Sequence, residues 1–517
     1  MILILWRMAC RVALLALMAL PGWAQDVTLT SRDGSVEVTG TLISYDGEFY
    51  RLNSAYGVLT LDGQGVVCAG VGCPDLDAYV ARFDFSGDPG IGATLLPALV
   101  EGFATARGFA LTREITGVDT FRLVLSLPGQ DRQMADIGFR LNSADQGFAD
   151  LLDGQADLVM SMREVRTDEA AALAAAGLGD LTQPARARIV ALDALVPVVA
   201  AGNLRRQIGM EELRAILSGQ QADWPGLELP IALHLGAGDA GFGDLLQRKL
   251  RFEFGTARQL ELTAYADAAE LSDSVAADPL ALGLVRRSEQ GNARILSLIG
   301  DCGVMLPTDR HALMAEDYPL TAPLFLYTPA QRLPLLAREF LDYLTTPAAH
   351  RIVRGLGLVD LGWEAIPLAL QGDRLTSAIT HAGGEVSLAD LQQMMQTLSG
   401  AARLTTTFRF RDGASALDAQ SFGNIATLAQ ALETGAFDDR TLIFAGFSDG
   451  AGSADANRAL SKTRAEAVRA AVRKAGFSAD FSRVKMQVEG FGEAMPMACD
   501  DNAWGRSMNR RVEVWLR

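Results

Sequence analysis

An acid and a base near the C-terminus, Asp449 and Arg464, lie 15 residues apart. The apolar stretch Leu442–Phe447 is typical of a buried strand, and a Gly-rich loop leads from it to a predicted helix that carries Arg464. The loop and the start of the helix can bring both side chains to one surface. There the carboxylate can pair with an ammonium group, and the guanidinium can bind a carboxylate in bidentate fashion. The spacing therefore suits a ligand that carries both groups, although a structural surface ion pair is the alternative.

The residues around this pair resemble a known family. The pattern D-x7-N-x2-LS-x2-RA begins at Asp449, and the tail Gly505–Val514 reads G-R-S-M-N-R-R-V-E-V. Both are similar to motifs of the OmpA-like peptidoglycan-binding domain, and the resemblance covers about Leu404–Arg517. In that family the Asp and Arg bind the diaminopimelate of the peptidoglycan stem peptide. The resemblance implies a peptidoglycan-binding set of Asp449, Asn457, Leu460, Arg464 and Arg510.

Several loops further upstream could bind an anion. Residues 85–92, 141–144 and 236–241 lie at predicted strand-to-helix junctions, where free N–H groups and the helix dipole attract negative charge. The segment Asp157–Arg163 ends a predicted strand with a hydroxyl and a guanidinium. Taken singly, each loop is better explained by helix capping. The candidate anion-binding residues are Ser86, Gly87, Asp88, Ser143, Ser161, Arg163, Asp239 and Gly241.

The order of these segments resembles the phosphate-binding proteins of ABC importers, the PstS-like type. Its most specific part is Met210–Trp224, MEELRAILSGQQADW, which is similar to that family's L-x-x-I-F-x-G-x-x-x-x-W signature. The resemblance covers about Asp84–Leu361. It implies a type II periplasmic-binding-protein fold, with two α/β lobes joined by hinge strands and an anion bound between helix N-termini. An ABC permease is then a candidate partner.

The chain departs from that family at the loops that would hold the anion. The family's Ser and Thr in the opening loop are Asp88 and Gly90 here, and the third loop lacks an arginine and two hydroxyls. Two aspartates would repel a dianion unless Asp88 or Asp239 accepts the proton of monohydrogen phosphate, which would discriminate against sulfate. An altered or lost specificity therefore stays open.

A dinucleotide-binding fingerprint is a further interpretation of the third loop. Its glycines fit G-x-G-x-x-G over residues 236–241, and Glu261 follows about 20 residues on. A lone motif of this kind predicts little, and an exported chain meets little nicotinamide cofactor. We expect no cofactor.

Composition and the N-terminus indicate an exported protein. The 517 residues are enough for about three domains, and the net charge of −16 gives no basic face for nucleic acid. Arginines precede a short apolar run, Val12–Leu20, and small residues follow it. This pattern predicts a signal peptide over residues 1–24, cleaved after Ala24 or Gln25, and export to the periplasm. No later stretch is long and apolar enough to span a bilayer, so the mature chain is expected to be soluble.

Four cysteines remain after that cleavage. Cys68 and Cys73 bracket a short Gly-containing loop and are expected to form a local disulfide in an oxidising compartment. Cys302 and Cys499 are either free thiols or an inter-domain bridge. The cysteine spacing and the four scattered histidines do not fit a metal site.

The elements that position these residues fall into four parts. Residues 26–80 read as a small β unit with Asp-Gly hairpin signals, and residues 81–368 alternate strands with helices. Residues 369–403 read as a linker, and residues 404–517 as a β-α-β-α-β domain. The expected helices are Leu95–Arg107, Phe148–Leu152, Met210–Leu217, Phe242–Leu250, Arg332–Leu344, Leu388–Leu398 capped by Ser387, Phe422–Leu432 and Arg464–Lys474.

Strands are expected where apolar runs are short. Ile189–Leu192 and Val196–Val199 are near-continuous apolar runs, which suit buried parallel strands. In the last domain, the expected strands are Thr405–Phe410, Leu442–Phe447, Val484–Glu489 and Val512–Leu516.

Taken together, the sequence predicts a multidomain α/β protein with a small N-terminal β unit, a two-lobed type II solute-binding domain and a C-terminal OmpA-like α+β domain. We expect a periplasmic binding protein for phosphate or a related anion that is attached to peptidoglycan in the cell envelope. The alternative is an envelope-organising protein whose α/β domain has lost anion binding. No catalytic constellation is discernible, so we do not expect an enzyme.

Overall fold

The computed structural model describes residues 26–226, 229–236, 246–247, 250, 261–265, 267–300, 303–381, 384–410 and 417–517. The predicted signal peptide, Asp239, Gly241 and Cys302 lie outside these ranges, as does most of the helix predicted at Phe242–Leu250. Among the helices in the described part of the chain, none combines the length and apolar character needed to cross a membrane.

The N-terminal unit is a small antiparallel sheet that docks on the next domain. Its strands, in the spatial order β4-β3-β2-β1-β5, are β1 (Asp26–Ser31), β2 (Glu37–Tyr45), β3 (Phe49–Ser54), β4 (Gly57–Asp62) and β5 (Val66–Ala69). Cys68 and Cys73 form a disulfide, with their Cα atoms 5.8 Å apart. Four buried apolar side chains form the unit's core cluster. A core of this size is marginal for a unit that folds alone, so contacts with the following domain help to stabilise it. Glu48 provides such a contact, because it accepts hydrogen bonds of 2.8 Å from both Arg332 and Arg338 of that domain.

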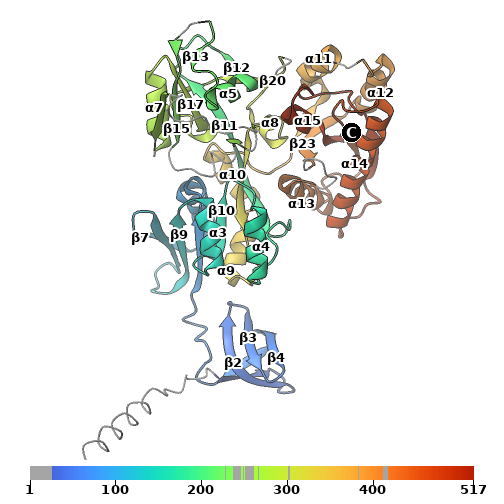
Figure 1. The fold of residues 1–517 in the computed structure, drawn as a ribbon. Coiled ribbons are helices and arrows are strands. Elements are labelled where there is room, and N and C mark those ends of the chain that lie inside the picture. The colour runs from blue at the N-terminus through green and yellow to red at the C-terminus, as the bar shows by residue number, and fades with distance from the viewer. Residues whose placement is uncertain are drawn as a thin grey trace, which may run out of the picture.

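The second part consists of two lobes whose strands form one continuous hydrogen-bonded path (Figure 1). The first lobe contains β6 (Ala81–Gly87), β7 (Ala110–Ile115), β8 (Thr120–Ser126), β9 (Gln133–Leu141), β10 (Leu158–Ser161) and β21 (Thr321–Tyr327). The second lobe contains β15 (Ala232–Gly236), β16 (Glu261–Tyr265), β17 (Ala281–Arg286) and β18 (Arg294–Ile295). The order is β16-β15-β17-β11-β21-β10-β6-β9-β8-β7, and β18 pairs with β11. Strand β11 (Ala187–Val199) therefore belongs to both lobes.

Strand β11 corrects one expectation. The two apolar runs expected as parallel strands are one strand of 13 residues. It pairs antiparallel with β21 through Ala194 and antiparallel with β17 from Leu195 onward. A run that is apolar on both faces indicates burial on both faces but does not encode the direction of its neighbours. The chain later returns from the second lobe and enters β21 of the first lobe.

Helices cover the lobes close to the expected positions. They are α2 (Leu96–Arg107), α3 (Ala144–Leu152), α4 (Thr167–Ala175), α5 (Met210–Leu217), α7 (Ala268–Ala277), α8 (Arg310–Met314), α9 (Leu335–Tyr343) and α10 (Pro347–Gly355). The bounds of α5 are those expected from the sequence. Short strands complete the second lobe: β12 (Gln207–Gly209), β13 (Asp223–Trp224), β14 (Leu229–Pro230), β19 (Ser297–Ile299) and β20 (Met305–Leu306). The aromatic rings of Phe85, Phe139 and Phe340 lie in the core of the first lobe.

The C-terminal domain is a five-stranded mixed sheet with helices on both faces. Its strands, in the order β22-β23-β26-β24-β25, are β22 (Ala365–Pro367), β23 (Ala402–Arg409), β24 (Thr441–Phe447), β25 (Lys485–Gly490) and β26 (Arg511–Leu516). Its helices are α11 (Gly372–Thr380), α12 (Leu388–Leu398), α13 (Ala419–Glu433), α14 (Ala454–Ala475) and α15 (Ala503–Asn509). Helices α13 and α14 share a core with one face of the sheet.

The segment expected as a linker belongs structurally to this sheet. Helix α12 has the bounds expected from the sequence, and Ser387 caps it by accepting a hydrogen bond from the Asp390 N–H. Met394 and Leu398 are buried against Ile443 and Trp515, on the sheet face opposite α13 and α14. The central strands β24 and β26 are buried along almost their whole length, so they need cover on both faces.

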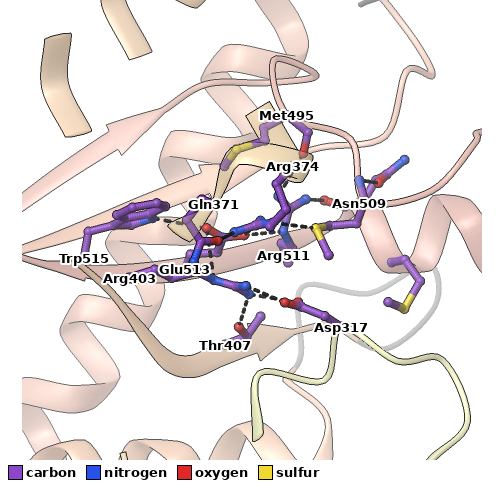
Figure 2. Close-up of polar contacts among 12 residues, drawn as sticks. Asp317, Gln371, Arg374, Arg403, Thr407, Met495, Asn509, Arg511, Glu513 and Trp515 are labelled. Atoms are coloured by element: carbon purple, nitrogen blue, oxygen red, sulfur yellow. Dashed lines mark hydrogen bonds and ion pairs between the residues drawn. The ribbon is translucent and has the colours of Figure 1, made fainter. Parts of the chain in front are cut away.

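A buried ionic network joins the C-terminal domain to the segment 315–320 between α8 and β21, here called the hinge region (Figure 2). Asp317, between α8 and β21, accepts two hydrogen bonds from Arg403 of β23, one of them 2.9 Å long. Glu513 of β26 contacts Arg403, Arg374 and Arg511, with a distance of 2.8 Å to the Arg511 Nε. Apolar residues of the α15 region, including Trp504, also lie in the same core cluster as the lobes. The C-terminal domain is therefore packed against the two-lobed part.

Candidate functional site

A close contact between β24 and α14 sets the position of the first candidate site. A Cβ atom added to Gly446 would lie 2.0 Å from the carbonyl oxygen of Ser461, so only glycine fits there. Ser461 and Ala465 are buried on the same face of the helix. This close packing holds the end of β24 against α14, and the loop 448–453 joins the two elements. The spacing of Asp449 and Arg464 in the sequence thereby becomes proximity in space.

Asp449, Arg464 and Arg510 form the charged centre of this site. The Asp449 carboxylate accepts a hydrogen bond of 2.8 Å from Arg510 Nη1, and the two side chains are 13% and 16% exposed. The Arg464 guanidinium lies over the ring of Phe410, 5.2 Å from its centroid. Its Nη1 is buried and has no hydrogen-bond partner among the described residues. Burial lowers the pKa of Arg464, Arg510 lowers it further, and Asp449 opposes both effects.

This arrangement leaves Arg464 with donors that an acceptor could satisfy. A buried N–H without a partner costs free energy that a bound carboxylate would recover. Two guanidinium groups and one carboxylate also leave an excess of positive charge at the centre. The centre can therefore bind a carboxylate, with Asp449 available to an ammonium group of the same ligand.

Acidic side chains surround the loop that carries Asp449. Glu493 accepts a hydrogen bond of 2.6 Å from the buried Asn457, and Asp500 accepts one of 2.6 Å from the N–H of Gly450. Leu460, the remaining residue of the predicted set, is 45% exposed on α14. Asn457 is therefore buried and held by Glu493, whereas Leu460 offers an exposed apolar surface on α14.

The residues of the C-terminal motif have different functions in the structure. Asn509 is buried and binds the backbone of Met497 and Ala498 through three hydrogen bonds of 2.7 to 3.1 Å. Arg511 is fully buried in the ionic network below. Arg510, between them, faces Asp449. Asn509 and Arg511 thus stabilise the fold, and Arg510 between them reaches the candidate site.

The second candidate site is a cleft of about 500 Å³ between the two lobes. Its first-lobe wall includes Asn142 and Ser143, and its second-lobe wall includes Tyr265, Asp267 and Arg286. Arg286, at the end of β17, reaches across to the first lobe. Its Nη2 lies 3.3 Å from Oδ1 and 3.4 Å from Oδ2 of Asp88. A cation and an anion from different lobes thus meet at the cleft.

Comparison with family models assigns both parts of the chain. Residues 409–510 match the OmpA family, and residues 134–348 match a PBP superfamily domain. The chain carries a PBP superfamily domain followed by an OmpA family domain. The expected family resemblances and the fold class are therefore confirmed.

Individual relatives cover parts of the chain. A stretch of 71 residues is 41% identical to "Probable lipoprotein YiaD" of Escherichia coli (strain K12), and the match spans 14% of this chain and 31% of that protein. The fold is similar to an ABC-type phosphate transport receptor from Vibrio cholerae, with a TM-score of 0.41, 15% identity, and coverage of 54% of this chain and 99% of that one. It is also similar to the peptidoglycan-associated lipoprotein from Burkholderia pseudomallei, with a TM-score of 0.19, 23% identity, and coverage of 22% and 90%.

The predicted anion-binding residues of the PBP part separate into two groups. Ser143 lines the cleft and caps α3 by accepting a hydrogen bond of 3.2 Å from the Gln146 N–H, whereas Asp88 is buried behind the wall and contacts Arg286, which lines it. Ser86 and Ser161 are fully buried and make hydrogen bonds within the protein. The structure does not bring these two hydroxyls to the described cleft wall.

Arg163 also lies away from the described wall of the cleft. Its side chain is 1% exposed and binds Glu169 at 2.6 and 2.8 Å and Asp145 at 2.5 Å. The remaining predicted loop residues are Gly87, which ends β6 with φ of +128°, and Asp239 and Gly241, which lie outside the described residues. The guanidinium that reaches the cleft is instead Arg286.

Sequence reasoning missed Arg286 as a site residue. The signal was present, because an arginine ends the otherwise apolar strand ALGLVR, and ends of strands in α/β folds face ligand sites. Its partner Asp88 is 198 positions away, so no local pattern could reveal the pair.

Proposed function

We propose that this chain is a periplasmic solute-binding protein for phosphate or a related anion, and that its OmpA family domain attaches it to peptidoglycan. The attachment rests on the buried Arg464 Nη1, which has no hydrogen-bond partner among the described residues, and on the neighbouring charges of Asp449 and Arg510. A diaminopimelate side chain carries both the carboxylate and the ammonium that these residues can bind. No enzymatic activity is proposed.

The solute-binding role rests on the PBP superfamily domain and on its cleft. The cleft lies between lobes that share β11, so a ligand that contacts both walls would favour the closed arrangement. The helix N-terminus at Ser143 and the guanidinium of Arg286 both favour negative charge there. An ABC permease would be the partner if the bound solute is imported.

A second candidate function is envelope organisation without a bound solute. It is favoured by the burial of Ser86, Ser161 and Arg163, whose polar groups are used inside the protein. In that case the PBP part would bind a protein partner, and the OmpA family domain would keep its role at the wall.

A thermal-shift measurement on the chain without residues 1–24 separates these two functions. Phosphate at about 100 times its Kd is expected to stabilise the bound form by about 2.7 kcal/mol, which raises the Tm of the PBP part by roughly 5–10 °C. Sulfate at the same concentration is expected to shift the Tm much less. If none of phosphate, sulfate and molybdate shifts the Tm, the solute-binding role fails and envelope organisation becomes the better account.

A further inference from the structure

Arg286 is the one positively charged side chain among the described residues that line the cleft. It belongs to the second lobe, and its guanidinium lies against the opening loop of the first. A Cβ on Gly90 would lie 1.5 Å from Arg286 Nη1, so any other residue at this position would force the guanidinium to move. The guanidinium of Arg286 therefore occupies the space that a side chain at residue 90 would take.

The contact between Arg286 and Asp88 is buried but loose. The side chains are 10% and 3% exposed, and the N–O distances of 3.3 and 3.4 Å exceed the 2.7–2.9 Å that is typical of strong charge-assisted hydrogen bonds. Glu289 adds a second carboxylate at 3.5 Å from Nη1. Because water is largely excluded, an incoming anion would be attracted strongly to the guanidinium but would have to compete with these carboxylates.

We propose that Arg286 is the anion-binding residue of the cleft and that Asp88 competes with the ligand for it. Arg286 then supplies, from the end of β17, the guanidinium that the third loop lacks. This inference rests on the proposed solute-binding function and specifies its ligand. Arg286 comes from one lobe and the opening loop from the other, so an anion between them would contact both lobes.

The charges on the wall narrow the class of ligand. Asp119, Asp267 and Glu289 also line the cleft, so the described wall carries more negative than positive charge. A fully ionised dianion has no proton to give and would be repelled, whereas an oxyanion that keeps a proton at neutral pH can donate that proton to a carboxylate. The ligand is therefore a small protonated oxyanion, for which inorganic phosphate is the simplest probe.

Isothermal titration calorimetry of the chain without residues 1–24 tests this assignment. Arg286→Gln is expected to weaken phosphate binding by about 10- to 100-fold, since hydrogen bonds to a charged group are lost. Arg286→Lys should recover part of the affinity. The matched control is Arg287→Gln at the adjacent position, which should bind like the wild type. Gly90→Ala provides a second variant, because its methyl group displaces the guanidinium without changing any charge.

Asp88→Asn tests the competing role of the carboxylate. With the competitor neutralised, sulfate is expected to bind measurably, whereas the wild type binds phosphate and excludes sulfate. If the wild type binds phosphate and both Arg286→Gln and Gly90→Ala bind it equally well, the assignment of Arg286 is wrong while the solute-binding function stands. If Asp88→Asn still excludes sulfate, the competing role of Asp88 is wrong. If the wild type binds no anion, both the function and this inference fail.

Discussion

Replacing Arg464 by alanine is expected to abolish sedimentation of the protein with purified peptidoglycan. The guanidinium lies over the ring of Phe410, and its buried Nη1 has no hydrogen-bond partner among the described residues. Loss of a bidentate interaction with a carboxylate removes two charge-assisted hydrogen bonds, so affinity should fall by at least about 100-fold. The measurement is the fraction of protein in the pellet after centrifugation with wall material that contains diaminopimelate.

Two variants on the same helix serve as comparisons. Arg464→Lys keeps the charge but loses the fork geometry, so it should pellet weakly. Arg469→Ala changes another arginine of α14 and should pellet like the wild type. Free diaminopimelate should compete with the wall for the wild type and for this control variant. If Arg464→Ala pellets as well as Arg469→Ala does, the wall site lies elsewhere and the motif has been assigned wrongly.

Replacing Arg403 by methionine is expected to give the largest loss of stability. Arg403 is 1% exposed and lies between Asp317 of the hinge region and Glu513 of the C-terminal sheet (Figure 2). Removing it leaves the buried Asp317 carboxylate without its hydrogen-bonding partner and takes one of three arginines from Glu513, which costs about 3–5 kcal/mol. The nearby arginines hold the pKa of Glu513 well below its usual value despite burial, so that carboxylate stays charged.

Differential scanning calorimetry measures this effect. The Tm of the transition that includes the C-terminal domain should fall by roughly 10 °C. Arg214→Ala is the control, because its pair with Glu211 is 44% and 41% exposed and should contribute at most about 1 kcal/mol. An Arg403→Met variant that melts like the control would show that the network does not stabilise the joined domains.

The elements that could be predicted from the sequence are those with strong local signals. The period of apolar residues and the cap at Ser387 placed α5 and α12 at their observed bounds. The closeness of Asp449 and Arg464 in space could also be predicted, because a short loop and one helix connect them. These features depend on residues close together in the chain.

What could not be predicted depends on contacts between distant residues. Strand β11 pairs antiparallel with β17 and β21, which are distant in the sequence. An apolar run in the sequence does not indicate whether its neighbouring strands are parallel or antiparallel. Arg163 looked available for an anion until the fold placed Asp145 and Glu169 against it. The segment 369–403 looked like a linker. Its apolar residues pack on one face of β24 and β26, and the sequence alone does not show that this face must be covered.

The most direct test of a wall-attached binding protein measures both activities in one sample. The chain without residues 1–24 is mixed with purified peptidoglycan and radiolabelled phosphate, and the label in the pellet is counted. Stoichiometric phosphate is expected in the pellet with the wild type, and none above background with Arg464→Ala, although that variant should still bind phosphate in the supernatant. A pellet that contains the wild-type protein but no phosphate would contradict the account.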